Sequence, residues 1–206
     1  PACNNKVFRP DNEAVARCQN LTCPAQTKKQ IEHFVSKGSM DIEGLGEKLI
    51  AQLIEKKLII DVGDLFYLTS EQLSNLERMG KKSADNIINA IENSKTTTLA
   101  RFIHGLGIRN VGEYGAKLLE NYFLGSLYKV MTAEVQELES IHEIGNIMAV
   151  SIVNFFDDPK NQEIVQKCIS GGVNFKPVKK LKDTKLDNKV IVFTGTLTHY
   201  SRAKAK

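Results

Sequence analysis

The sequence predicts a mainly α protein: a small cysteine subdomain, four repeats of a helix, short hairpin, helix unit, and a truncated α/β segment. Three observations predict this fold class. Three of the four cysteines lie in the first 23 residues, one pattern recurs four times through the middle of the chain, and a lysine-rich stretch near the end precedes an apolar run. We place the subdomain at 1–26, the repeats at 27–172, a basic linker at 173–188 and the last segment at 189–206.

The composition is that of a globular chain with a mildly basic balance. Of the 206 residues, 42% are hydrophobic and 25% are charged, and the net charge is +4. This excess permits a nucleic-acid partner, but ordinary solvated surfaces carry it too. No apolar run approaches the roughly 18 residues that span a bilayer, and no signal peptide is recognisable, so we expect no membrane partner. Because the chain begins at Pro1 and stops at Lys206 within a helical pattern, we expect both ends to be cuts in a longer protein.

The clustered cysteines Cys3, Cys18 and Cys23 favour a metal site over a disulfide framework. A structural zinc site needs four thiolate or imidazole ligands. Pro1-Ala2-Cys3 looks like the end of a Cys-Pro-Ala-Cys knuckle, so we expect the fourth cysteine just before Pro1. The alternative is three unrelated thiols. With one ligand missing, zinc binding and local order in this subdomain should both be weakened.

Two further residues bear on this site. His33 lies on an expected helix, which makes it a poor substitute ligand. Cys168 stands on an apolar helix face with Ile164, Val165 and Ile169, so we expect a core thiol rather than a ligand.

The recurring pattern consists of an apolar residue, two free positions, a second apolar residue and then glycine. It occurs at residues 42–50, 76–84, 108–116 and 141–149. The repeated glycines are 34, 32 and 33 residues apart in sequence: Gly46, Gly80, Gly112 and Gly145. Such near-constant spacing indicates one structural unit used four times.

Apolar residues at helical spacing follow each glycine, as Ala84, Ile87 and Ile91 follow Gly80, and they predict a helix that starts directly after it. A shorter helical stretch, such as 70–77, precedes each hairpin. We expect the glycine to allow a tight turn with left-handed φ and to bring the backbone close to a ligand. The helix N-terminus beyond it offers unpaired N–H groups and a positive dipole end, which suit a phosphate.

An ordinary helical corner with a glycine at its end is the alternative for any single copy. Four copies favour the ligand-binding interpretation, since a plain helical bundle needs no repeated hairpin. Main-chain donors would bind nucleic-acid phosphates without regard to the bases. Basic residues stand near three of the hairpins, although solvated surface is the alternative for each of them: Lys48, Arg78, Lys81, Lys82, Arg109 and Lys117.

Beyond Gly171-Gly172 the composition changes. Lysines crowd residues 176–189, which predicts an exposed linker with at most a weak electrostatic contact to nucleic acid. The apolar run 190–193 then predicts a buried strand, followed by Thr194-Gly195-Thr196 and a helix start near Ser201. This last segment resembles the opening strand and loop of a BRCT domain.

The repeated unit resembles the helix-hairpin-helix family, whose members hold the DNA sugar-phosphate backbone through the hairpin. That family typically has a further glycine two residues before the repeated one. Only the first copy has it, as Gly44, whereas the others carry Arg78, Asn110 and Glu143. The acidic Glu143 makes the fourth copy the least suited to a phosphate. The resulting candidate DNA-binding residues are Gly44, Gly46, Lys48, Arg78, Gly80, Lys81, Lys82, Arg109, Gly112, Lys117 and Gly145.

The order of cysteine knuckles, four hairpin units, basic linker and BRCT start resembles the C-terminal half of bacterial NAD-dependent DNA ligases. Stretches such as 40–46, 106–112 and 193–197 are also similar to that family. The resemblance implies an enzyme that seals nicks in duplex DNA: NAD adenylates a lysine, AMP passes to the 5′-phosphate, and the 3′-hydroxyl displaces it. The adenylated lysine belongs to a Lys-x-Asp-Gly motif that this chain lacks, because Lys185-Leu-Asp-Asn188 has no glycine.

We therefore expect no catalytic residue here, with NAD and Mg²⁺ bound outside this segment and zinc as a structural ion. The resemblance implies a monomer in the bacterial cytoplasm, associated with the nucleoid, that clamps nicked duplex DNA while the absent nucleotidyltransferase domain works. The alternatives are a stand-alone helix-hairpin-helix module of a repair or recombination protein, which needs neither the cysteine site nor the BRCT start, and a helical scaffold for protein partners, whose binding would not depend on phosphates.

Overall fold

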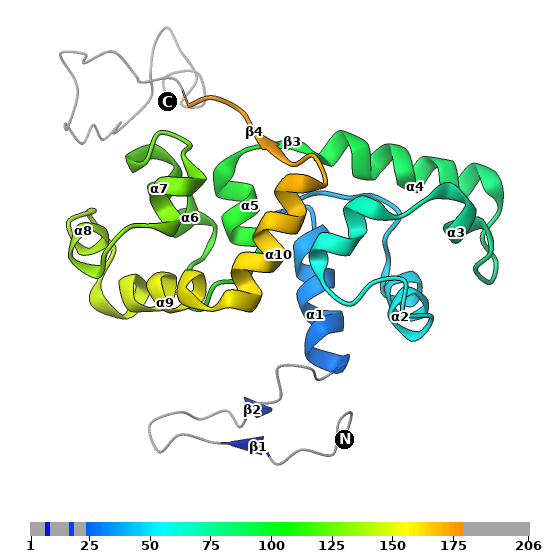
Figure 1. The fold of residues 1–206 in the computed structure, drawn as a ribbon, viewed down its shortest axis with the longest axis horizontal. Coiled ribbons are helices and arrows are strands. Elements are labelled where there is room, and N and C mark those ends of the chain that lie inside the picture. The colour runs from blue at the N-terminus through cyan, green and yellow to red at the C-terminus, as the bar shows by residue number, and fades with distance from the viewer. Residues whose placement is uncertain (1–6, 9–16, 19–23, 179–206) are drawn as a thin grey trace, which may run out of the picture.

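The computed structural model describes residues 7–8, 17–18 and 24–178. The described part is mainly helical, as predicted, and it consists of hairpin-linked helices around one apolar core (Figure 1). The expected metal ligands Cys3 and Cys23, the linker beyond 178 and the BRCT-like segment lie outside the described residues. No described helix has the length and apolar character needed to cross a membrane.

In each repeat one helix ends before the hairpin and another begins at the residue after the repeated glycine, which confirms the predicted unit. The four pairs of helices are α1 (Pro24–Val35) with α2 (Glu47–Glu55), α3 (Ser70–Ser74) with α4 (Lys81–Ser94), α5 (Leu99–Gly105) with α6 (Glu113–Tyr122), and α8 (Val135–Glu139) with α9 (Asn146–Asp157). We call the connecting residues hairpin 1 (36–46), hairpin 2 (75–80), hairpin 3 (106–112) and hairpin 4 (140–145).

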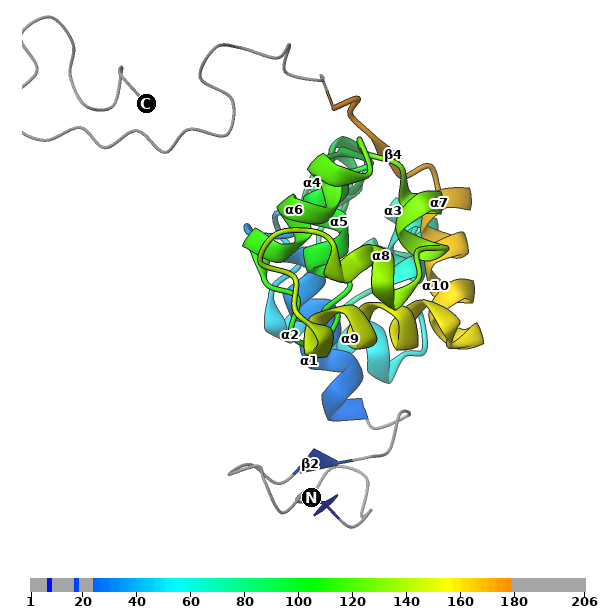
Figure 2. The ribbon, with the colours of Figure 1, turned by 90° about the vertical axis from the view of Figure 1, so that its left-hand side faces the viewer.

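Three further helices connect or close the repeats. They are the 3₁₀ helix η1 (Val62–Tyr67), α7 (Leu127–Met131) and α10 (Pro159–Ser170). Figure 2 looks onto the end of the molecule that carries α7, α8 and α9. Near the N-terminus, β1 (Val7–Phe8) pairs antiparallel with β2 (Arg17–Cys18), so that Cys18 faces Val7 across the ribbon.

The apolar positions of the repeated pattern anchor every hairpin in the core. Ile42 and Leu45 are buried in hairpin 1, and the same two positions are buried in hairpins 3 and 4; in hairpin 2 Leu76 is buried and Met79 partly so. Phe34 and Phe102 meet edge to face at the centre, with ring centroids 6.2 Å apart. The spacing of the pattern is thus explained by two side chains that point inward just before each glycine.

The hairpins pack as two pairs. Hairpin 1 lies against α4, where a Cβ on Gly44 would stand 2.9 Å from Cγ1 of Ile87. Hairpin 3 lies against α9, where the Asn110 amide donates to the Ser151 hydroxyl at 3.0 Å. In both cases the odd-numbered hairpin rests on the second helix of the following repeat, so hairpins 1 and 2 form one pair and hairpins 3 and 4 the other.

Polar contacts join the two pairs into one body. Arg101 of α5 reaches the loop of hairpin 1, where its Nε donates to the carbonyl of Ser39 at 2.6 Å and its Nη2 to that of Lys37 at 2.7 Å. Lys167 of α10 contacts Asp61 (3.0 Å), the residue before η1, and Asp64 (2.6 Å), in the first turn of η1. These contacts fix how the two pairs of hairpins are placed relative to each other.

The first residues after α10 do not form the exposed linker that the lysine content predicts. Val173 is buried, and β4 (Asn174–Phe175) pairs in parallel with β3 (Thr96–Thr97). The Lys176 amide also donates to the Thr97 carbonyl at 2.8 Å. Residues 173–176 therefore extend the helical body, because an apolar side chain and a strand ladder are available where lysine content alone suggested solvent.

Cys168 and His33, the two other residues weighed as metal ligands, both have partners within the helical body. Cys168 is buried on α10, and burial raises the pKa of its thiol to about 12, which confirms a core thiol. His33 makes a 2.7 Å hydrogen bond between its Nε2 and the His104 carbonyl. It thereby ties α1 to α5.

Replacing Lys167 with Met should lower the free energy of unfolding by about 1–3 kcal/mol, because two partly buried carboxylates lose their counter-charge. Urea unfolding followed by circular dichroism measures this. Lys160→Met is the matched control, since Lys160 is exposed on the same helix. Equal stability of the two variants would show that the contact of Lys167 with Asp61 and Asp64 does not stabilise the fold.

The same contact predicts a pH dependence. Burial lowers the pKa of Lys167, but hydrogen bonds to Asp64 and Asp61 outweigh it and raise the pKa above 10.5. A raised folded-state pKa means that the stabilisation is complete below pH 10.5 and is lost as the pH rises through the higher folded value. The stability difference between the wild type and Lys167→Met should therefore persist at neutral pH and shrink only above that point.

Candidate nucleic-acid interface

The repeated glycines are not in the left-handed conformation that the sequence suggested. Their φ values lie between −79° and −89°, which any residue can adopt. The left-handed residue stands two positions earlier: Gly44 (φ 90°), Arg78 (59°), Asn110 (64°) and Glu143 (69°). The expectation was wrong in position because the turn bends before the second apolar side chain of the pattern enters the core.

Nothing inside the protein requires glycine at the repeated position. Within the described part, a Cβ on Gly46, Gly80, Gly112 or Gly145 would meet no atom within 4 Å beyond its chain neighbours. All four glycines are exposed. Since neither φ nor internal packing selects glycine, the missing side chain leaves room for something that approaches the backbone from outside.

The helices that follow these glycines begin without a side-chain cap. Each glycine is the N-cap, and no side chain accepts a hydrogen bond from the first turn of α2, α4, α6 or α9. By contrast, α3, α5, α7 and α10 are capped by the oxygens of Thr69, Thr98, Ser126 and Asp158. The uncapped helices thus present bare N–H groups at a positive dipole end, where an anion is stabilised.

Hairpin 2 has the strongest positive charge. Arg78, Lys81 and Lys82 are exposed, α4 has no acidic residue in its first turn, and none of the three makes an ion pair with a described residue. Two lysines at a helix N-terminus oppose the dipole, and a left-handed arginine costs about 1 kcal/mol relative to glycine. An anion bound at Gly80 would offset both penalties.

Hairpin 1 has a weaker positive charge. Lys48 is exposed in the first turn of α2, next to Glu47, whose carboxylate receives a 2.7 Å hydrogen bond from Lys28. That hydrogen bond lowers the pKa of Glu47. Because Lys28 holds Glu47, the Lys48 ammonium and the bare amides remain available to a phosphate.

Hairpins 3 and 4 differ from the first pair. Arg109 and Lys117 are exposed on either side of Gly112. In hairpin 4 the Glu143 carboxylate lies 3.8 Å from His142 Nδ1, and its position beside Tyr114 raises the pKa of that tyrosine. With an acid at its tip and no lysine or arginine, hairpin 4 fits a phosphate least well.

Two exposed residues that lie beside the repeated glycines were not singled out from the sequence. Tyr114 and Ile147 are 61% and 73% exposed in the first turns of α6 and α9. Both stand two positions after the repeated glycine, where the first two copies have Lys48 and Lys82. Aligning this position across the four copies could have found them.

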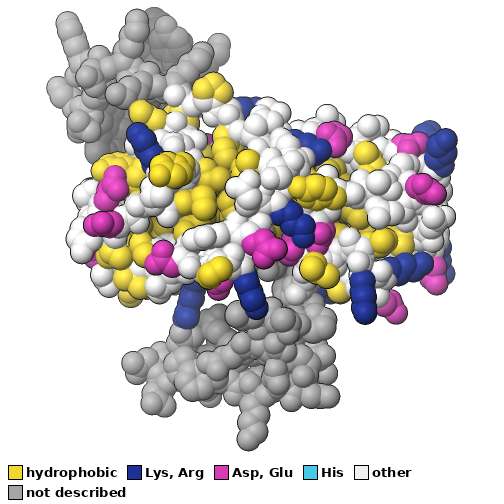
Figure 3. All heavy atoms as spheres, in the orientation of Figure 1, with side chains coloured by type: hydrophobic (Ala, Val, Ile, Leu, Met, Phe, Trp, Pro, Cys, Tyr) yellow, Lys and Arg dark blue, Asp and Glu magenta, His cyan; other side chains and the backbone are white. Residues whose placement is uncertain are grey.

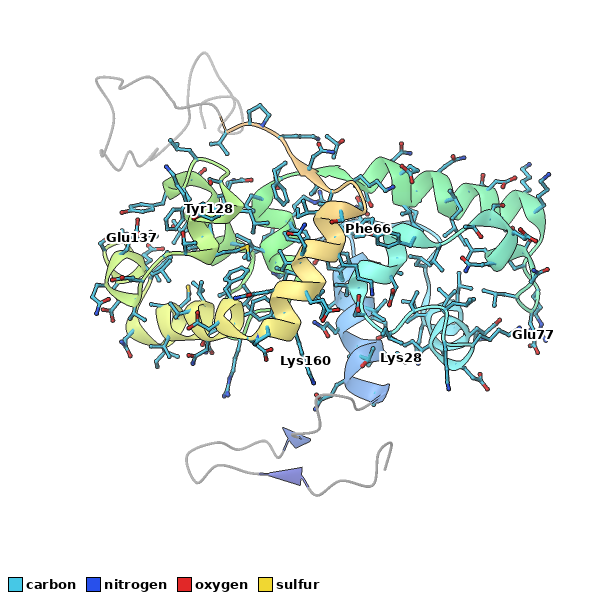
Figure 4. All side chains as sticks on the ribbon, in the orientation of Figure 1. Lys28, Phe66, Glu77, Tyr128, Glu137 and Lys160 are labelled. Atoms are coloured by element: carbon cyan, nitrogen blue, oxygen red, sulfur yellow. The ribbon has the colours of Figure 1, made fainter. Side chains whose placement is uncertain are left out.

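On the face shown in Figure 3, lysine and arginine side chains are interspersed with acidic ones and apolar side chains fill the area between, so this face carries no continuous basic patch. Glu77 in hairpin 2 and Glu137 in α8 lie at opposite ends of the long axis (Figure 4). Hairpin 2 and α8, which leads into hairpin 4, therefore lie toward opposite ends of the molecule.

For the metal site, the structure describes only Cys18, in β2. The strands of this ribbon are two residues long, and so short a hairpin cannot bury a core of its own. A tetrahedral thiolate site would supply the missing stabilisation, so the residues present fit a structural zinc. Among the described residues, no three His, Cys, Asp or Glu side chains form another such group.

Comparisons with known proteins match this architecture segment by segment. Residues 1–25 match the NAD-dependent DNA ligase C4 zinc finger domain, 40–93 the SAM-like helix-hairpin-helix tandem, and 101–165 the helix-hairpin-helix motif. Of the last two segments, 40–93 includes residues 40–46 of hairpin 1 and all of hairpin 2, and 101–165 includes hairpins 3 and 4.

The whole chain also aligns with proteins named DNA ligase. It is 46% identical to that of Koribacter versatilis, 45% to that of Carboxydothermus hydrogenoformans and 44% to that of Clostridioides difficile. In each case all of this chain is covered, but it spans only 30–31% of the relative's length. The chain thus carries a match to the zinc finger domain of NAD-dependent DNA ligases followed by helix-hairpin-helix units, and over its whole length it is similar to a segment of proteins named DNA ligase.

Proposed function

We propose that this segment is the non-catalytic DNA-binding portion of an NAD-dependent DNA ligase, which clamps nicked duplex DNA through its sugar-phosphate backbone. The observation that supports this most strongly is the set of four exposed glycine N-caps. The helices that follow them have no side-chain cap, and among the described residues a Cβ on any of the four glycines would meet open space. Neither backbone conformation nor packing explains why glycine stands there. A phosphate is the common anion that fits such a helix N-terminus.

The binding would be independent of sequence, because main-chain N–H groups read no base edges. Each pair of hairpins would hold the backbones that flank the minor groove. Because Arg101 and Lys167 join the two pairs, the second pair would bind as an intramolecular event once the first is engaged. Such a clamp suits an enzyme that must hold both sides of a nick in register.

Sealing chemistry would belong to other parts of the enzyme. The chain has no Lys-x-Asp-Gly motif, so the adenylated lysine and the NAD and Mg²⁺ sites would lie outside it. Zinc, held by Cys3, Cys18 and Cys23 with a fourth ligand, would be structural, because four protein sulfurs leave no open position for substrate. A monomer in the bacterial cytoplasm, near the nucleoid, accords with this role.

The alternative of a stand-alone repair or recombination module is less well supported. It needs no zinc finger, whereas residues 1–25 match the ligase finger, and the relatives at 44–46% identity over the whole chain are named DNA ligase. A scaffold for protein partners would leave the repeated glycines without a reason.

Gly80→Asp should stabilise the protein yet weaken DNA binding. Gly80 has N-cap geometry and open space, so an aspartate there caps the helix and adds about 0.5–1 kcal/mol of stability. The same carboxylate repels a phosphate, and affinity for a nicked duplex should fall about tenfold, or about 1.4 kcal/mol. Thermal unfolding and fluorescence anisotropy measure the two effects.

Gly80→Asn is the matched control for that change, because it caps the helix without charge and should weaken binding less. The pair Gly112→Asp and Gly112→Asn repeats the comparison at hairpin 3. If the aspartate variants are correctly folded and bind nicked duplex as tightly as the wild type, the hairpin assignment is wrong.

The chain should show no nick-sealing activity with NAD and Mg²⁺, since it lacks the nucleotide-accepting lysine motif. A denaturing gel of a nicked, labelled duplex tests this. Ligated product, with enzyme-free and heat-inactivated controls blank, would refute the division of labour.

Adding one cysteine directly before Pro1 should strengthen zinc binding at least tenfold, because it restores a fourth thiolate. Competition with a chromogenic chelator measures the affinity, and Cys18→Ser in the extended chain should remove the gain. The helical body should keep its far-UV circular dichroism when zinc is stripped, since its described cysteine, Cys168, is a buried core residue. No gain from the added cysteine would contradict the proposed ligand set.

A further inference from the structure

We infer that the second pair of hairpins contacts duplex DNA through exposed apolar and aromatic side chains, with Ile147 and Tyr114 set against deoxyribose in the minor groove. The inference rests on the proposed DNA-binding function and deepens it. The bare amides after Gly46, Gly80 and Gly112 would supply the salt-dependent phosphate contacts, and Tyr114 and Ile147 would add a contact that does not depend on salt.

The first observation is the position of these residues in the repeat. Two residues after the repeated glycine, copies 1 and 2 carry Lys48 and Lys82, whereas copies 3 and 4 carry Tyr114 and Ile147. All four side chains are exposed. The position that bears an ammonium in one pair of hairpins thus bears an apolar surface in the other, at an equivalent place in the fold.

The second observation is that the apolar surface continues along α9. Val150, one turn after Ile147, is also exposed, whereas Ile152 and Phe156 of the same helix are buried and its other apolar side chains are buried at least in part. Single exposed apolar residues are normal on protein surfaces. Here, however, two lie together beside Gly145, where the backbone is bare and a Cβ would meet nothing within the described part.

Contacts between hairpins 3 and 4 bring Tyr114 and Ile147 close together, at the N-terminal ends of α6 and α9. Glu143 of hairpin 4 lies close enough to Tyr114 to raise the pKa of its hydroxyl. In the next position along α6, a Cβ on Gly115 would stand 3.2 Å from Met148 Sδ, so the first turns of α6 and α9 pack closely. Tyr114 and Ile147 therefore come from adjoining helix N-termini.

Charge decides between the two chemical surfaces of DNA. The exposed Glu143 carboxylate disfavours a phosphate at hairpin 4, because the two negative charges would repel each other. The minor groove, by contrast, is lined by the C–H surfaces of deoxyribose, and proteins that bind it commonly insert isoleucine, leucine or phenylalanine there. The apolar surface of Tyr114 and Ile147, next to Gly112 and Gly145, therefore fits the minor groove better than it fits the charged backbone.

The test compares Ile147→Ser with Lys82→Met in the 206-residue chain, with a fluorescent nicked duplex as the probe. Ile147→Ser should weaken binding about five- to twentyfold at every salt concentration and leave the slope of log affinity against log salt unchanged. Lys82→Met should reduce the magnitude of that slope by about 0.9, the value expected for one neutralised phosphate. Ile147→Leu should restore most of the lost affinity.

Ile60→Ser is the matched control, because Ile60 is 68% exposed but belongs to no hairpin, and its affinity should stay at the wild-type value. If Ile147→Ser binds like Ile60→Ser while Lys82→Met is weakened, the minor-groove contact is overturned and the phosphate clamp stands. A changed salt slope in Ile147→Ser would also overturn it, since it would place a phosphate there. If Lys82→Met and Gly80→Asp both bind normally, the proposed function itself fails.

Discussion

The interaction on which the structure depends is the burial of two apolar side chains in each hairpin, three residues apart and just before the repeated glycine. These side chains fix the tip of the hairpin to the core, as Ile42 and Leu45 do in the first copy and Ile141 and Ile144 in the fourth. Once they point inward, the next residue and the first amides of the following helix must point outward. The hydrophobic core therefore determines where bare N–H groups appear on the surface, and it does so four times with one pattern.

At the helix N-termini after the repeated glycines, the stability of the folded chain competes with its ability to bind an anion. Helices such as α3, α5 and α10 use Thr69, Thr98 and Asp158 to satisfy their first amides, while those after the repeated glycines leave them bare. Lysines at the start of α4 and a left-handed Arg78 add further local penalties. Features that cost stability and recur at equivalent positions are expected where a ligand supplies the missing partner. The cross-links by Arg101 and Lys167 keep the four corners in one arrangement.

The repeat made most of the fold predictable from the sequence. Period, helix starts and the inward apolar positions follow from spacing alone, and the helices begin at the residues expected. The left-handed residue could not be located in the same way, because Arg78 and Glu143, unlike Gly44 and Asn110, are not residue types that favour positive φ. The ladder between β3 and β4 was missed because two-residue strands leave no period to detect. Tyr114 and Ile147 were overlooked because exposure depends on packing between repeats, which no single copy encodes.

The central claim is that the first backbone amides after Gly46, Gly80 and Gly112 bind phosphates of duplex DNA. A titration of the ¹⁵N-labelled chain with nicked duplex, followed by heteronuclear NMR, tests it most directly. The account predicts the largest shifts, at low salt and reversed by added salt, for the amides of Glu47, Lys81 and Glu113 and their successors in the same first turns. Shifts confined to other surfaces, with these amides unmoved at saturation, would contradict it.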